Sequence, residues 1–153
     1  MPSSVTFTEL CDGIADTFDD LCPNLNRTER PAQLAGGMND DAVLQVYPDS
    51  GSQDPGGQTD RTTFGGGVRQ TEAIILCDLY AKQLNEPGEG MAALLPLVDE
   101  VVNALEAQDS EPFLGVVGIQ QFRWSWRRVV FEYGDRGQTK YVGARFTLTV
   151  RLY

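Results

Sequence analysis

The chain has 153 residues, 41% hydrophobic and 22% charged, a composition that suits one folded domain with a packed core. Its 22 acidic side chains outnumber the 12 basic ones, and the formal net charge of −10 disfavours general binding to nucleic-acid phosphates. The sequence has no histidine, which excludes Ser-His-Asp and Cys-His nucleophile pairs and most zinc sites. We therefore expect a protein that is not an enzyme and has no cofactor and no metal.

Targeting segments and disulfides are not expected either. The first residues, Met-Pro-Ser-Ser, have neither the basic nor the apolar part of a signal peptide, and no run approaches the ~18 apolar residues of a membrane helix. The three cysteines, Cys11, Cys22 and Cys77, are odd in number and form no CxxC pair. We expect them to be buried thiols in a protein that folds in a reducing environment.

Apolar side chains at helical spacing predict a first helix from about Thr8 to Leu21, with Thr6 or Thr8 as its N-cap. The apolar stripe consists of Phe7, Leu10, Cys11, Ile14, Phe18 and Leu21. The opposite face is acidic. Asp16 and Asp20 on that face have the spacing of paired ligands for a divalent cation, but no third ligand accompanies them, and a solvated acidic face is the simpler interpretation.

A short strand at residues 43–47 and a long polar loop at residues 48–67 come next. The loop consists mainly of Gly, Pro, Ser, Asp, Gln and Thr. A stretch of this length without apolar side chains is typical of a functional segment, here a flexible loop that orders on assembly. The run Gly65-Gly66-Gly67 lacks the lysine and the following helix of a phosphate-binding loop.

Residues 68–81 predict a central strand that is covered on both faces, although the spacing of Ala73, Leu76 and Tyr80 also fits a helix. The run Asn-Glu-Pro-Gly at 85–88 predicts a turn. A second helix follows, with Pro96 in its first turn or at a kink near its start. Its apolar stripe is the strongest in the sequence and consists of Met91, Leu94, Leu95, Val98, Val102 and Leu105.

A long hairpin closes the chain, with its turn at residues 134–137. From Phe122 to Trp126 the apolar side chains occupy even positions, and from Val129 they occupy odd positions. An extra residue would produce such a change of face, so we predict a β-bulge at Arg127–Arg128. In the return strand the inward positions are Val142, Ala144, Phe146, Leu148, Val150 and Leu152, and the outward positions are Tyr141, Arg145, Thr147, Thr149 and Arg151.

Together these elements predict a single α+β domain over residues 1–153. We expect an antiparallel sheet of about four strands with two main helices packed on it, in the order α-β-loop-β-α-β-β, and a long C-terminal hairpin.

Charge is distributed unevenly along the chain. The formal charge is −9 over residues 1–60, −5 over residues 61–110 and +4 over residues 111–153. Head-to-tail association of identical subunits would exploit a basic hairpin on an acidic body, whereas arginines that balance acidic helices within one subunit are an equal alternative. The candidate subunit or tube interface consists of Arg123, Arg127, Arg128, Arg145 and Arg151, with Trp124 and Trp126 as core side chains or interface anchors.

The order of elements resembles one family. The chain begins with a capped N-terminal helix and a strand ending in Leu44-Gln45-Val46-Tyr47-Pro48. It continues with a Gly-rich loop, a second strand, a Leu/Val-rich helix at 92–105 and a closing hairpin. Over nearly the whole chain this resembles the tail terminator, or tail-completion, proteins of long-tailed bacteriophages, the minor tail protein U type.

The resemblance implies a structural virion protein of the tail and neck, assembled in the host cytoplasm. Proteins of this family form hexameric rings that cap the tail tube, stop its polymerisation and provide the surface that joins the head connector. The expected partners are thus the chain itself, the tail tube protein and the connector, with DNA only as passing cargo and no membrane. An acidic lumen would repel that DNA. The candidate lumen or docking residues are Asp49, Asp54, Asp60, Arg61 and Phe64.

Three other interpretations remain at this stage. The nearest is another head-tail connector or neck protein, or a tail-tube subunit. A small acidic binding module without enzymatic activity is the second. An enzyme is the third, and its only candidate catalytic groups are Asp/Glu pairs, Cys77 and arginines.

Overall fold

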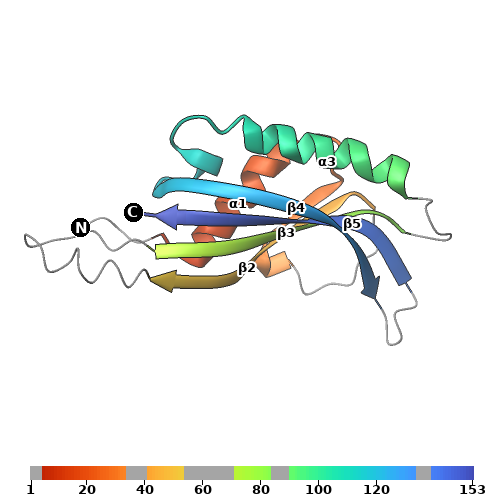
Figure 1. Ribbon diagram of the computed structural model, residues 1–153, viewed down its shortest axis with the longest axis horizontal. Coiled ribbons are helices and arrows are strands. Elements are labelled where there is room, and N and C mark those ends of the chain that lie inside the picture. Colours follow the sequence, from red (N-terminus) through yellow and green to blue (C-terminus); the bar gives the residue numbers. More distant parts are fainter. Residues whose placement is uncertain (1–4, 34–40, 54–70, 84–89, 134–138) are drawn as a thin grey trace, which may run out of the picture.

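One five-stranded sheet, in the order β1-β2-β3-β5-β4, forms the frame of the molecule (Figure 1). The structure is a computed structural model that describes residues 5–33, 41–53, 71–83, 90–133 and 139–153. The helices and strands are α1 (Phe7–Leu21), β1 (Arg27–Glu29), β2 (Val43–Gln53), β3 (Thr71–Gln83), α3 (Met91–Glu106), β4 (Ile119–Tyr133) and β5 (Thr139–Leu152). Two short 3-10 turns, η1 (Pro31–Gln33) and η2 (Phe113–Gly115), complete the set.

The fold is α+β, as predicted, but the sheet is mixed and has one strand more than expected. Strand β1 pairs in parallel with β2, whereas the other three pairings are antiparallel. The expectation of a four-stranded antiparallel sheet is therefore wrong. With three half-buried residues, β1 is too short to display the alternation of apolar and polar side chains by which a strand is recognised.

Helices α1 and α3 pack against one face of the sheet, and the core lies between these layers. Alternate side chains of β3 and β5 point into it, among them the fully buried Ile75, Leu79 and Phe146. Helix α1 begins as predicted, because the Thr6 hydroxyl accepts a hydrogen bond from the backbone N–H of Glu9. Helix α3 begins at Met91, so Pro96 lies in its second turn.

The predicted bulge at Arg127–Arg128 is wrong. Pairing between β4 and β5 runs without interruption from Gln121 to Tyr133, and the single register shift lies between Ile119 and Gln121. The apolar pattern changes because the side chains near the hairpin turn are buried on the opposite face of the sheet. There Phe131 packs on a second cluster, which consists of Val43, Tyr80 and Tyr141.

The turn end of the hairpin bends away from the helices (Figure 1). The ring centroids of Phe131 and Tyr80 lie 4.3 Å apart on the side that the helices leave uncovered. Tyr141, predicted to point outward, does so and is still only 3% exposed because this second cluster covers it. A small second cluster on the face opposite the main core thus explains the change of pattern without a bulge.

Strand β2 extends to Gln53, so the polar loop begins later than expected. A register shift lies between Pro48 and Ser50. The rest of the predicted loop, with Gly65-Gly66-Gly67, and the predicted turns at 85–88 and 134–137 lie outside the described residues.

All three cysteines are free and buried. Burial, followed by the charge of Asp12, raises the pKa of the Cys11 thiol to about 11. Burial, followed by the charge of Glu100, raises the pKa of Cys22 to about 12. Burial also raises the pKa of Cys77 well above its ordinary value, so none of the three is an activated thiolate near neutral pH.

Among the helices of the described residues, none combines the length and the apolar character needed to cross a membrane.

Candidate functional site

The side of the sheet that points away from α1 and α3 is its open face, and no described helix packs on it. The register places polar and charged side chains there from three adjacent strands. They are Glu72 and Asp78 of β3, Arg145, Thr147, Thr149 and Arg151 of β5, and Gln121, Arg123, Ser125 and Arg127 of β4. This surface collects most of the arginines that the sequence singles out.

A buried ionic network lies at the centre of the open face. The Arg145 guanidinium donates from Nε to Asp78 Oδ1 over 2.8 Å and from Nη2 to Asp78 Oδ2 over 3.0 Å. The Tyr47 hydroxyl donates to the same Oδ2, and Arg145 Nη2 lies 3.3 Å from that hydroxyl. Asp78 is 1% exposed, so its charge is compensated by the paired guanidinium and the phenol.

This network restrains Arg145. The hydrogen bond to Asp78, opposed by burial, raises the pKa of the Arg145 guanidinium above its ordinary value. Burial, followed by the hydrogen bond to Asp78, raises the pKa of the Tyr47 phenol. Arg145 therefore joins β3, β5 and β2 within one subunit, so of the two equal alternatives that the charge pattern left open, Arg145 follows pairing inside the subunit.

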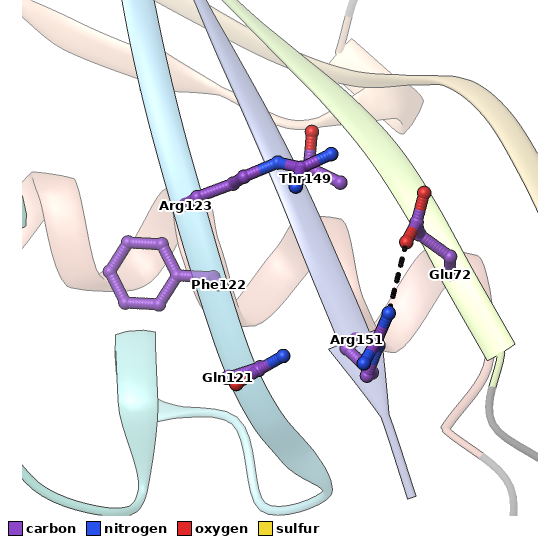
Figure 2. Close-up of a pocket in the computed structure, with 6 residues that line it drawn as sticks. All are labelled: Glu72, Gln121, Phe122, Arg123, Thr149 and Arg151. Carbon is purple, nitrogen blue, oxygen red and sulfur yellow. Dashed lines mark ion pairs between the residues drawn. The ribbon is translucent and has the colours of Figure 1, made fainter.

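A small pocket opens at the end of this face where β5 finishes (Figure 2). Its volume is about 200 Å³, and its lining includes Glu72, Gln121, Arg123, Thr149 and Arg151. Figure 2 shows the Arg123 side chain reaching across β5 toward Thr149, while the Phe122 ring extends from the opposite side of β4. Two guanidinium groups, a hydroxyl and an amide in one hollow suit an oxyanion such as a carboxylate.

The two arginines of the pocket differ in their partners. Arg151 Nη2 lies 3.8 Å from the Glu72 carboxylate, and both side chains are more than one third exposed, so the pair is weak. Arg123 forms no ion pair with any residue that the structure describes. Arg123 is thus the cation of this pocket that is available to a partner.

Arg127 and Arg128 point to opposite sides of β4. Arg127 lies beside Arg145 on the open face, whereas Arg128 lies opposite Ala144 on the helix side. Both are exposed, and within the described part of the chain neither forms an ion pair. The candidate interface arginines therefore do not form one continuous patch.

The two tryptophans share the helix side of β4, as predicted. Trp124 is half-buried against the main core. Trp126 stacks on Phe146, with ring centroids 6.2 Å apart, and keeps 39% of its surface exposed. Trp124 thus acts as a core side chain, and Trp126 is left accessible at the edge of the sheet.

Of the candidate lumen residues, only Asp49 lies in the described chain. It is exposed and belongs to β2 at the register shift, not to the loop as expected. Asp54, Asp60, Arg61 and Phe64 lie outside the described residues.

The helices carry the opposite charge to the C-terminal strands. Helix α1 contains five acidic residues and α3 contains three, and neither contains a lysine or arginine. Strands β4 and β5 contain six basic residues and one acidic residue. Arg30 pairs with Asp16 of α1, while Asp19 and Asp20 are exposed. No three His, Cys, Asp or Glu side chains gather as metal ligands within the ranges that the structure describes.

Asp78 and Tyr47 were missed by the sequence analysis, although one signal was present. Asp78 is the one charged residue in the apolar run 73–81, and it alternates with Leu76 and Tyr80. A carboxylate in the middle of a central strand requires a cationic or hydrogen-bonding partner on a neighbouring strand. That requirement would have linked Asp78 to an arginine of the closing hairpin.

We found no match between this chain and any protein-family model or curated protein.

Proposed function

We propose that the protein is a structural virion component that assembles head to tail into a ring on the end of a tail tube. In this role it ends tail polymerisation and provides the surface at which the head joins. The resemblance in element order suggests this role and a ring of six copies.

The observation that carries the proposal is the separation of charge between layers. The helical layer has eight acidic residues and no basic ones, whereas β4 and β5 have six basic residues and one acidic residue. Identical subunits with opposite charges on opposite sides attract one another in a head-to-tail arrangement. A contact of this kind closes into a ring when its rotation allows.

The contact we propose joins the open face of one copy to α1 of the next. Arg123 and Arg151 line a pocket of about 200 Å³ that suits a carboxylate. Asp19 and Asp20 are exposed on α1 and provide such carboxylates. The acidic residues that remain outside the contact give the ring surface a charge that repels passing DNA.

A second hollow bears on the alternative of a small binding module. A groove of about 610 Å³ lies between the start of α1 and the end of β5, and its lining includes Val5, Glu9, Glu111, Val117 and Tyr153. The Tyr153 hydroxyl donates to Glu111 over 2.6 Å. Two carboxylates in the lining disfavour an apolar ligand, so we retain the structural role. A connector or tail-tube protein is the nearest variant of that role.

The proposal is tested by light scattering coupled to size exclusion at low and moderate salt, with negative-stain images of the heaviest species. We expect ring particles of about six chains that dissociate as salt rises, because screening weakens exposed charge pairs. Arg123→Glu on β4 should reduce the ring fraction strongly, whereas the control Lys140→Glu, near the start of β5, should not. A single-chain mass at both salt concentrations, or equal effects of the two substitutions, would contradict the proposal.

A further inference from the structure

The outer edge of β4 is the longest unpaired edge among the described strands. Strand β4 has 15 residues, and β5 is its one neighbour in the sheet. Most of its side chains from Gln121 to Glu132 are exposed. A strand of this length with free backbone N–H and C=O groups on one side is a template for pairing with another strand.

The opposite edge of the sheet is protected, and this one is not. At that edge β1 has only three residues, and the part of β2 that β1 does not cover contains Pro48 and a register shift. Proline and bulges are devices that prevent pairing at an edge. Strand β4 has no proline or glycine, and its single register shift lies at its first residues. Among the strands that the structure describes, β4 thus has the one long edge that is ready to pair.

We propose that β4 pairs antiparallel with β4 of a second copy about a two-fold axis at Trp126. The two sheets then form one continuous ten-stranded sheet with both helical layers on the same side. The contact uses the edge of the sheet, not its open face, and does not depend on the proposed function.

The register follows from the arginines. Trp126 is the midpoint of Ile119–Tyr133, so an axis there pairs the full length of both strands. No arginine then faces an arginine of the second copy. Across the axis Trp126 faces itself, Arg128 faces Trp124, Val130 faces Phe122, Arg127 faces Ser125, and Arg123 faces Val129.

Neighbouring registers are worse. An axis at Ser125 places Arg123 opposite Arg127, and an axis at Arg127 places that residue opposite itself. Like charges directly opposite each other destabilise a strand pair. An axis at Trp124 avoids these contacts but leaves residues 130–133 of each strand unpaired.

The same register covers the exposed apolar surface of β4. Trp126 is 39% exposed and Val130 is 43% exposed on the helix side of the strand. In the pair, Val130 contacts Phe122 of the second copy, and the two Trp126 rings meet at the axis. Arg128, which has no ion pair among the described residues, lies against the Trp124 ring as a cation–π contact.

Disulfide trapping tests this register. Trp126→Cys places two thiols opposite each other at the axis, within the reach of a disulfide. Val130→Cys is the control, because its two copies lie eight residues apart along the pair, roughly 26 Å. The three native cysteines are buried and do not compete for oxidation.

A second pair of variants avoids any loss of Trp126 packing. Ser125→Cys combined with Arg127→Cys changes two exposed residues of the open face, and each new thiol faces the other type across the axis. Arg123→Cys combined with Ser125→Cys is its control, because its thiols face each other in registers centred on Arg123, Trp124 or Ser125 and not in the register centred on Trp126. Circular dichroism verifies that all four variants are folded.

We expect both test variants to give a non-reducing band at twice the 16.8 kDa of one chain, lost on reduction, and both controls to remain single. At moderate salt, which screens the charge pairs of the proposed ring contact, the unmodified chain should still have at least the mass of a dimer. Folded test variants without the band, or controls with equal bands, would overturn the proposal. Rings of six chains without the band at residue 126 would support the proposed function and refute this contact. The band at residue 126 without rings would support this contact and refute the proposed function.

Discussion

Asp78 is the residue on which the centre of the sheet depends most directly. A carboxylate that is 1% exposed loses its hydration, and this loss is tolerable only if charged and polar partners replace the water. Arg145 contributes two hydrogen bonds to it and Tyr47 a third. Because Arg145 remains partly exposed, its own charge keeps some contact with water.

We predict that Asp78→Asn lowers the free energy of unfolding by about 1–3 kcal/mol, because charge-assisted hydrogen bonds are lost at a buried site. Glu72→Gln is the matched control on the same strand and face. Its partner Arg151 lies 3.8 Å away and both side chains are partly exposed, so the expected loss is under about 0.5 kcal/mol. Urea denaturation measures both changes. Equal losses would show that the Asp78 network contributes no more than a surface pair.

At the scale of the element, the β4–β5 hairpin depends on Gly143, where the backbone of β5 lies close to the Leu79 carbonyl and the Phe131 ring. This glycine pairs with Tyr80 on one side and Val129 on the other, on the open face. A Cβ atom there would lie 2.0 Å from the Leu79 carbonyl oxygen and 2.6 Å from the Phe131 ring. The aromatic ring occupies the space that a side chain would need, which is why the second cluster can form on this face.

We predict that Gly143→Ala destabilises the protein by about 1–3 kcal/mol or more, because a backbone carbonyl cannot move aside as a side chain can. Gly51→Ala is the control in another strand. Its Cβ would meet only the far end of the Phe7 ring, which is 43% exposed and free to rotate. Thermal unfolding should give a clearly larger drop in Tm for Gly143→Ala, and similar drops would contradict the close approach.

At the scale of the whole molecule, charge is sorted by layer. Helices α1 and α3 contain eight acidic residues and no basic ones, and β4 and β5 contain six of the 12 basic residues, although the chain as a whole carries −10. Such a distribution is a directional property of the molecule. It favours contacts between unlike sides of identical copies over contacts between like sides.

We predict that Arg123→Glu and Asp19→Lys each prevent ring formation alone and restore it when the two variants are mixed. In the mixture, the reversed open face of one variant meets the reversed helix of the other, and the unchanged surfaces meet each other. Alternation of the two variants closes a ring with an even number of copies. Light scattering of each variant and of the equimolar mixture measures this, and a mixture that stays as small as its components would contradict the head-to-tail contact.

Several elements could be predicted because their signals are local. The apolar spacing and the Thr6 cap of α1, and the alternation in β5, depend on residues that are close in sequence. The change of face in β4 is visible in the sequence, but its cause could not be predicted, because the second cluster that buries Phe131 is built from β2, β3 and β5. Strand β1 was missed because its three residues obtain their structure from pairing with β2.

The sequence by itself determined the α+β class, the limits of the main helices, the inward face of β5 and the separation of charge between early and late segments. Periodicity and charge are properties of the chain, and they survive any arrangement of its elements. Tertiary structure alone decided that Arg145 is paired with Asp78 while Arg123 is available, and that β4 lies at an edge. Asp78 and Arg145 are 67 positions apart, and they can form an ion pair only because the order of strands places β3 beside β5.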